Sequence, residues 1–141
     1  AGHVLCKLPR GAEGYMGRLR CVQEISAVTA ACMMVKTSVF KAVGGFDEEL
    51  KVAFNDIDLC MKVRKYGVKI VFTPYAELYH YESKSRGMED TPEKQLRFSR
   101  EVNCFRRKWE RELLKGDPYY NPNLTLNNTD CSLRKQEKNG D

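Results

Sequence analysis

The sequence predicts an α/β domain in which a short mixed sheet is flanked by helices and followed by a long C-terminal helix. Two apolar runs predict strands: Ile25–Val35 is nearly continuous apolar sequence, and the β-branched run Val68–Phe72 ends before Pro74. A regular apolar stripe predicts the long helix, because large apolar side chains recur every three or four residues between Thr91 and Gly116. Strands and helices that follow one another in this way are typical of the α/β class.

The composition is that of one globular domain. The chain has 141 residues, of which 42% are hydrophobic and 30% charged. It contains no apolar run of about 18 residues, so we expect no membrane-spanning helix. Six cysteines occur without a C-x-x-C pair, which argues against zinc-ribbon and thioredoxin-like sites. Cys32 and Cys60 lie inside apolar patterns and are expected to be buried thiols, which fits a protein of the reducing cytoplasm.

Positive charge gathers in the C-terminal helix. The net charge is only +5, but the segment Glu93–Lys115 holds eight Lys or Arg against four Glu. Such a helix can bind an anionic lipid, a nucleic acid or a phosphorylated substrate, or it can simply present a solvated face. We expect no nucleic-acid partner, because the aromatic side chains of this helix follow its apolar stripe and do not alternate with the basic residues.

The first half of the chain is expected to form a loop, a strand and a short helix. Residues 1–24 are basic and interrupted by glycines, which predicts a loop or a flexible arm. The run Ile25–Val35 is expected to be a strand buried on both faces, and its small side chains suit either the floor of a site or plain core packing. Thr37 is expected to cap a short helix, Ser38–Val43, which Gly44 ends, and Gly45 then permits a tight turn.

A further helix is expected to begin at Asn55 and to end at Gly67. Asn55 is a good N-cap residue, and Asp58 at the third helical position completes a weaker form of the capping box. The buried side is formed by Ile57, Cys60, Met61 and Val63. Asp56 points away from that side, where the helix dipole and free amides stabilise a charged carboxylate. It is either a second capping acid or a functional group.

Two later segments carry candidate ligands. Residues Ala76–His80 are expected to form a second short strand, which ends at His80. A single His in such a place is more often an ordinary surface or core residue than a ligand, and the sequence leaves both open. In the polar segment that follows, Lys84 and Arg86 can close over an anionic ligand, although an ordinary solvated loop fits equally well.

Three of these segments in succession resemble a known family. Gly44-Gly45-Phe46-Asp47-Glu48, then Asn55-Asp56-x-Asp58-Leu59-Cys60, then a strand ending near His80, is an order similar to that in the C-terminal half of the catalytic domain of family 2 glycosyltransferases. The resemblance covers about Tyr15 to Leu126 and is strongest to a bacterial subgroup that includes rhamnosyltransferases of surface-polysaccharide synthesis. It implies a partial GT-A fold, the fold of nucleotide-diphospho-sugar transferases.

The resemblance also implies roles for individual residues. Asp56 would be the catalytic base, and Asn55 stands where the family usually has Glu. The acceptor sugar would be bound by Gly45, Phe46 and Asp47. On the donor side, the diphosphate would be bound by Lys84 and Arg86, and His80 would be the metal ligand.

The implied activity is inverting transfer of a sugar from a nucleotide-sugar donor to a glycan acceptor in cell-surface polysaccharide synthesis. The intact enzyme would use a divalent metal, Mn²⁺ or Mg²⁺, held by an Asp-x-Asp motif in its donor-binding half. No such motif occurs among residues 1–50. Residues 1–126 are therefore expected to be the acceptor-side portion of the domain, and residues 127–141 a polar, disordered tail. By itself this fragment would be inactive and need not hold the metal.

A non-catalytic function from another class stays open. The chain could be a binding or self-association module derived from such a domain. Apolar surface left on the stripe Phe98–Leu113 or on an unpaired sheet edge would favour a homo-oligomer. Contact with a membrane would be peripheral at most, at the inner face.

Overall fold

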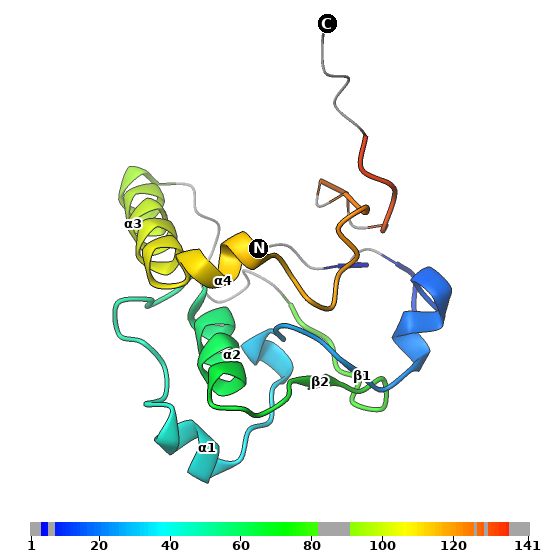
Figure 1. Ribbon diagram of the computed structural model, residues 1–141, viewed down its shortest axis with the longest axis horizontal. Helices are drawn as coiled ribbons and strands as arrows, with labels where there is room; N and C mark the ends of the chain where they lie inside the picture. Colours follow the sequence, from blue (N-terminus) through cyan, green and yellow to red (C-terminus); the bar gives the residue numbers. More distant parts are fainter. Residues whose placement is uncertain (1–3, 6–7, 82–90, 126, 129, 136–141) are drawn as a thin grey trace, which may run out of the picture.

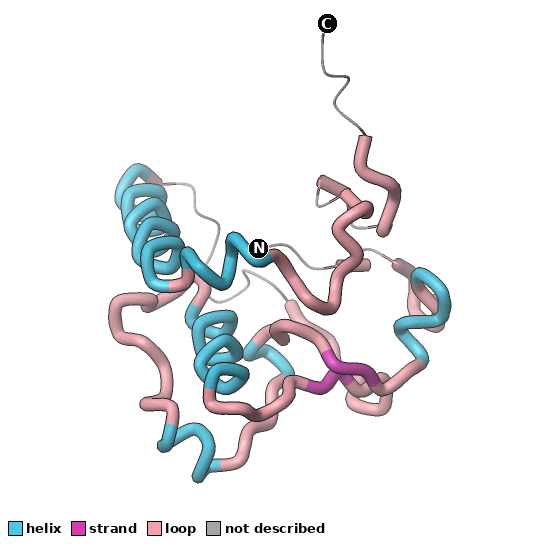
Figure 2. The backbone as a smooth tube through the Cα atoms, viewed as in Figure 1, coloured by secondary structure: helices cyan, strands magenta, loops and turns pink. Residues whose placement is uncertain are grey.

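The computed structural model describes residues 4–5, 8–81, 91–125, 127–128 and 130–135. Its helices are α1 (Thr37–Ala42), α2 (Asn55–Lys65), α3 (Pro92–Lys108) and α4 (Glu110–Lys115), with the 3-10 helices η1 (Tyr15–Arg20) and η2 (Ala30–Cys32); its strands are β1 (Gln23–Glu24) and β2 (Val71–Phe72). The predicted mixture of helices and strands is confirmed. Most of the chain outside the helices is loop (Figure 2).

The sheet is much smaller than the sequence predicts. Its two strands pair antiparallel, with Gln23 opposite Phe72, and one further hydrogen bond joins Ile25 N to Ile70 O at 3.0 Å. The prediction of a strand through Ile25–Val35 is wrong: this run forms a bend, η2 and extended loop, and the Met34 side chain is 99% exposed. A buried strand needs a neighbour on each side, and the described residues supply only β2.

The segment after β2 also departs from its predicted structure. The expected strand Val68–Phe72 is reduced to Val71–Phe72. The expected strand Ala76–His80 is wrong, since these residues are exposed loop. Alternation alone does not make a strand where no partner edge lies beside it.

The turn after α1 confirms the role of its two glycines. Helix α1 begins one residue earlier than expected and uses Lys36 as N-cap, without a side-chain hydrogen bond, so the predicted Thr37 cap is wrong. Gly44 and Gly45 have φ angles of +78° and +63°, which favour glycine. A Cβ on Gly45 would also lie 3.0 Å from the Phe40 ring. Gly45 therefore serves both the turn and the packing beneath it.

Helix α2 lies at the centre of the helical part of the molecule (Figure 1). Its N-cap is Phe54, in the left-handed region at φ 64°, and Asn55 is the first helical residue. The predicted Asn55 N-cap is therefore wrong, and the helix begins one residue earlier than expected. Asn55 still bonds at this end, since its Oδ1 accepts the Asp56 N–H at 2.8 Å. The predicted end is confirmed: Tyr66 is the C-cap and Gly67 follows with φ +92°.

The predicted long helix is interrupted. Thr91 caps α3 as expected, with Oγ1 accepting the Lys94 N–H at 3.3 Å, and Pro92 occupies the first helical position. At Trp109 the backbone leaves helical geometry, with φ −117° and ψ 22°, and α4 continues from there to Gly116. Trp109 belongs to the predicted apolar stripe and is almost fully buried in the core, as that stripe predicts.

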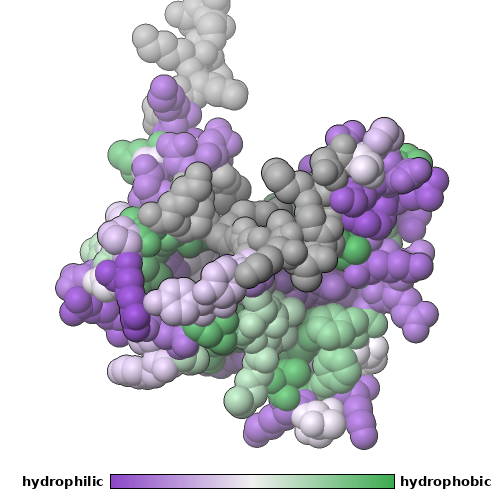
Figure 3. Space-filling view, turned by 180° about the vertical axis from the view of Figure 1, so that it is seen from behind, coloured by the Kyte–Doolittle hydropathy of each residue, from purple (hydrophilic) through white to green (hydrophobic). Residues whose placement is uncertain are grey.

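The core forms where α3 meets the start of α2. Leu50, Phe105 and Trp109 are its buried centre, and Phe54, Ile57, Met61 and Cys104 pack around them. The Phe54 ring stacks on Phe105, with 5.1 Å between ring centroids. The centre of the predicted apolar stripe is therefore covered within the chain. Its two ends, Phe98 and Leu113, remain partly exposed. Seen from behind, polar surface covers both flanks of the molecule and apolar surface gathers in the lower half of that face (Figure 3).

A fully buried carboxylate connects α2 to the junction of α3 and α4. Asp58 Oδ1 accepts the Trp109 Nε1–H at 2.8 Å and lies 2.8 Å from Lys108 Nζ. Asp58 Oδ2 forms an ion pair with Lys62 Nζ at 3.1 Å. Asp58 therefore bonds across the core, and its predicted role in a capping box is wrong.

A second buried carboxylate, Glu101, reaches the loop before α2. Its Oε2 accepts the Ala53 N–H at 2.7 Å, and its Oε1 lies 3.9 Å from Arg97 Nε. Because both carboxylates are paired, burial does not leave an isolated charge.

The chain after α4 folds back over the small sheet. The Tyr119 hydroxyl donates to Glu24 Oε2 at 3.0 Å, and Ser26 donates to Asp117. Further on, Leu124 and Leu133 form an isolated antiparallel bridge, and Cys131 beside it is buried. The polar composition after residue 126 gave no sign of this pairing; the division of the chain at that residue stays a prediction.

The hydrogen bond between Trp109 and Asp58 is testable by a double-mutant cycle. Replacing Trp109 by Phe keeps most of the apolar burial and removes the donated N–H. We expect the free energy of unfolding to fall by about 1.5–3 kcal/mol, the usual range for a hydrogen bond to a charged group. In an Asp58→Ala background the same substitution should cost clearly less, because its partner is already gone. Equal costs in both backgrounds, measured by urea unfolding, would show that this bond contributes nothing.

Candidate active site

Asp56 lies in the first turn of α2, facing the loop that contains η2. Its Oδ1 accepts the Ile57 N–H at 2.8 Å and its Oδ2 accepts the Ala30 N–H at 3.2 Å. The residue is half-buried. Asp56 thus accepts two backbone amides at the start of α2.

The loop segment opposite Asp56 is held against α2 by a buried cysteine. Cys60 Sγ lies 3.5 Å from Val28 N and 3.7 Å from Val28 O. Burial raises the pKa of the Cys60 thiol. The predicted burial of Cys60 is confirmed, whereas Cys32 is exposed and its predicted burial is wrong.

The turn containing Gly45, Phe46 and Asp47 is attached to α2 and α3 by two lysines. The Gly45 carbonyl accepts a hydrogen bond from Lys62 Nζ at 3.0 Å. Asp47 forms an ion pair with Lys108 and accepts the Glu49 N–H at 3.0 Å. Phe46 is 47% exposed and lies edge-on to Phe40, with ring centroids 5.6 Å apart.

Asp58 is the common partner of these two lysines. Lys62 bridges Asp58 and the Gly45 carbonyl, and Lys108 bridges Asp58 and Asp47. The hydrogen bond to Lys108 holds the pKa of Asp47 below its ordinary value. Burial disfavours the charge on Lys108, but its bonds to Asp47 and Asp58 prevail and raise the Lys108 pKa. The acidic turn and the helix that carries Asp56 are therefore held by one network.

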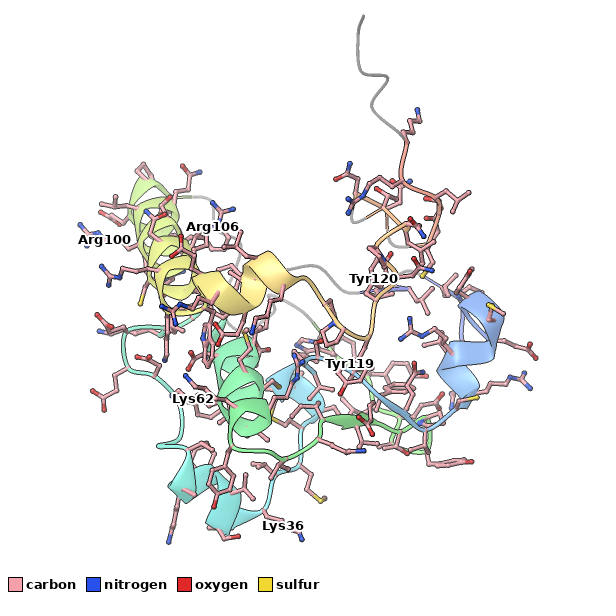
Figure 4. All side chains as sticks on the ribbon, in the orientation of Figure 1. Lys36, Lys62, Arg100, Arg106, Tyr119 and Tyr120 are labelled. Carbon is pink, nitrogen blue, oxygen red and sulfur yellow. The ribbon has the colours of Figure 1, made fainter. Side chains whose placement is uncertain are left out.

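Sequence reasoning missed most of this network. Lys62 could have been found, because it follows Asp58 by four residues and such pairs face each other on a helix. The contacts of Lys108 and Trp109 with Asp58 could not, since these residues lie about 50 positions further along the chain and no local pattern pairs them with it. Figure 4 shows Lys62 projecting from α2 beside the core.

Of the three predicted donor-side residues, the structure describes only His80. His80 lies in exposed loop after β2. Lys84 and Arg86 lie outside the described residues. Among the residues that the structure describes, no three His, Cys, Asp or Glu side chains are grouped so that they could hold a metal ion. The role of His80 as a metal ligand and the diphosphate contacts of Lys84 and Arg86 therefore stay predictions.

The chain is similar to short stretches of much longer proteins. It is 55% identical over 134 residues to the uncharacterized protein y4gI of Sinorhizobium fredii, a match that covers 94% of this chain and 15% of that protein. It is 37% identical over 142 residues to the O-antigen biosynthesis protein RfbC of Myxococcus xanthus, covering 100% of this chain and 11% of RfbC. The chain thus spans less than a sixth of the length of either relative.

A third similarity is more local. Over 62 residues, 44% of this chain, the sequence is 36% identical to an N-acetylglucosaminyl-diphospho-decaprenol L-rhamnosyltransferase of Mycobacterium tuberculosis, of which the match covers 20%. No protein-family model and no solved structure matches the chain. The expected GT-A fold and membership of family 2 accordingly stay predictions.

The Asp47–Lys108 ion pair predicts a loss of stability in acid. The pKa of Asp47 is lower in the folded protein than its ordinary value of 3.8. Its contribution is therefore complete above about pH 4 and is lost as the pH falls through the folded-state pKa. We expect Asp47→Asn to lower the free energy of unfolding at pH 7 by on the order of 1 kcal/mol, since both side chains are partly exposed, and by less in acid.

The measurement is urea unfolding of both proteins at neutral pH and below pH 4. Glu48→Gln, at the neighbouring exposed position, is the matched control and should change neither value appreciably. A difference between wild type and Asp47→Asn that is the same at both pH values would contradict this account of the ion pair.

Proposed function

We propose that these residues are the acceptor-side portion of an inverting family 2 glycosyltransferase that acts in cell-surface polysaccharide synthesis. The names of two relatives, one for O-antigen biosynthesis and one for rhamnosyl transfer, support a role related to glycosyl transfer. The observation that carries the proposal is the position of Asp56 in the first turn of α2, where its carboxylate accepts two backbone amides and its side chain is only half-buried.

In this proposal Asp56 is the general base. A carboxylate has about four lone-pair positions, and backbone amides occupy two of those on Asp56. A remaining position can accept the proton of an acceptor hydroxyl while its oxygen attacks the anomeric carbon of the donor. The bond from that carbon to the nucleoside diphosphate breaks on the opposite face, so the configuration inverts.

The turn Gly45-Phe46-Asp47 is the proposed acceptor contact. The Phe46 ring presents an exposed apolar face, and Asp47 presents a carboxylate that accepts hydrogen bonds from sugar hydroxyls. Lys108 already pairs with Asp47, but a carboxylate has several acceptor positions. An acceptor hydroxyl could therefore bind the same carboxylate while the ion pair to Lys108 is kept.

On the donor side, the proposal retains Lys84 and Arg86 for the diphosphate and His80 for Mn²⁺ or Mg²⁺ in the intact enzyme. A divalent ion would neutralise charge on the leaving diphosphate.

One observation favours a non-catalytic alternative. Both oxygens of Asp56 accept backbone amides, which is also what a purely structural capping acid would do. In that case the chain would be a binding or self-association module, and its proposed partners would be a glycan or a second copy. For either function we propose a cytoplasmic location.

Replacing Asp56 by Asn tests the base directly, in a transferase-active protein that contains these residues. Asn keeps the size and an acceptor oxygen but cannot take the proton. Turnover should fall by roughly 10²–10⁴ while affinity for the nucleotide-sugar stays nearly unchanged. Glu48→Gln, exposed and outside the proposed site, should keep turnover. An Asp56→Asn protein with near wild-type turnover would favour the capping role.

A binding measurement tests whether the donor site lies elsewhere. In titration calorimetry of the 141-residue chain with a nucleoside diphosphate and Mn²⁺, we expect no binding tighter than about 1 mM, roughly −4 kcal/mol. Micromolar binding would place a nucleotide site within these residues and contradict the proposed division into donor and acceptor portions.

A further inference from the structure

The outer surface of the α3–α4 junction carries an open groove of about 460 Å³. It is lined by Arg106, Arg107, Glu110, Leu113 and Leu114. Leu114 is 82% exposed and Leu113 is 47% exposed. Two adjacent leucines on a short helix are thus presented to solvent, next to a pair of arginines.

The groove carries arginines that the described residues leave without an ion pair. Arg106, Arg107 and Arg111 are exposed, and none forms an ion pair with a carboxylate of the described residues. The adjacent Lys108 behaves differently, because it turns inward to Asp47 and Asp58. Glu110 is the acidic residue that lines the groove. The outward face therefore combines free guanidinium groups with exposed hydrocarbon.

We propose that this face docks on an anionic lipid bilayer, with Leu113 and Leu114 entering the interface and Arg106 and Arg107 contacting lipid phosphates. Helices that lie on membranes have this combination of basic and large apolar side chains. Each cation near an anionic surface strengthens binding roughly five-fold, and the leucines supply the apolar part that a purely electrostatic partner would not need.

The same groove is poorly suited to a nucleic acid. Single strands are bound by exposed aromatic rings that stack on bases. The aromatic residues nearest the groove in sequence are Phe105 and Trp109; both are buried, and the Trp109 indole N–H is bonded to Asp58. The exposed Leu113 and Leu114 side chains, by contrast, suit the apolar part of a lipid bilayer.

Docking by this face leaves the candidate active site open. None of the groove residues is among the contacts of Asp56, which come from Ala30 and from the first turn of α2. In Figure 4 Arg106 lies above the α3–α4 junction, whereas Lys36, before α1, lies at the opposite end of the view. This inference does not depend on the proposed transferase activity, because it concerns a separate surface.

Vesicle co-sedimentation of the 141-residue chain tests the proposal. The probes are vesicles of phosphatidylcholine alone and vesicles with about 30% phosphatidylglycerol, at about 0.1 M salt. We expect binding to the anionic vesicles that weakens as salt is raised, and little binding to the neutral ones. The double variant Arg106→Gln/Arg107→Gln should bind roughly 25-fold more weakly, and Leu113→Ser/Leu114→Ser at least about tenfold more weakly.

Two control variants match these changes at other exposed positions. Lys36→Gln/Lys41→Gln removes the same charge near α1, and Met34→Ser removes an apolar side chain that is 99% exposed. Each should change binding by less than about twofold. Circular dichroism of every variant checks that the fold is kept.

Four results would overturn the proposal. One is equal binding to neutral and anionic vesicles, and another is an equal loss in the Lys36→Gln/Lys41→Gln control. The third is that Leu113→Ser/Leu114→Ser leaves vesicle binding intact and instead abolishes self-association in sedimentation velocity, which would assign the leucines to a contact between copies. Binding to a single-stranded oligonucleotide as tightly as to the vesicles, without dependence on the leucines, would equally count against a membrane partner.

Discussion

The buried carboxylate of Asp58 is the interaction on which the rest of this small fold depends. It has no exposed surface, and it receives a hydrogen bond from Trp109 and charges from Lys62 and Lys108. A buried charge is tolerated only when it is paired in this way, so the helices must keep the relative positions that bring the three partners together. The direction of α2, and with it the position of Asp56, follows from this requirement.

The helices could be predicted from the sequence because their signals are local. Thr91-Pro92, Gly67 and Gly116 mark helix ends by backbone preference alone, and the structure has helix ends there. The strands could not be predicted, since an apolar run such as Ile25–Val35 becomes a strand only when other strands lie beside it. An apolar run has the same sequence pattern whether or not other strands lie beside it. The missing information was the presence of neighbours, which is not local.

In the candidate site, too, the features set by local sequence signals could be predicted, and those set by contacts distant in sequence could not. The place of Asp56 in the first turn of α2 follows from helix signals and is confirmed, within one residue of the predicted start. The inward position of Trp109 also follows from the apolar stripe and is confirmed by its burial. Its hydrogen bond to Asp58 could not be foreseen, because the two residues lie 51 positions apart in the sequence. The roles assigned to Gly45, Phe46, Asp47 and His80 came from family resemblance and stay predictions.

The left-handed residue at the entrance of α2 has a consequence for which substitutions position 54 can accept. A side chain other than glycine in this backbone region carries a cost of about 1–2 kcal/mol, so relieving the backbone would by itself favour glycine or asparagine. The Phe54 ring, however, stacks on Phe105 and packs around the buried core. Neither glycine nor asparagine has an aromatic ring that could replace this packing. Backbone conformation and core packing thus select opposite amino acids at one position. A substitution that satisfies either demand fails the other, so tolerance to change should be low here even though the residue takes no part in any proposed chemistry.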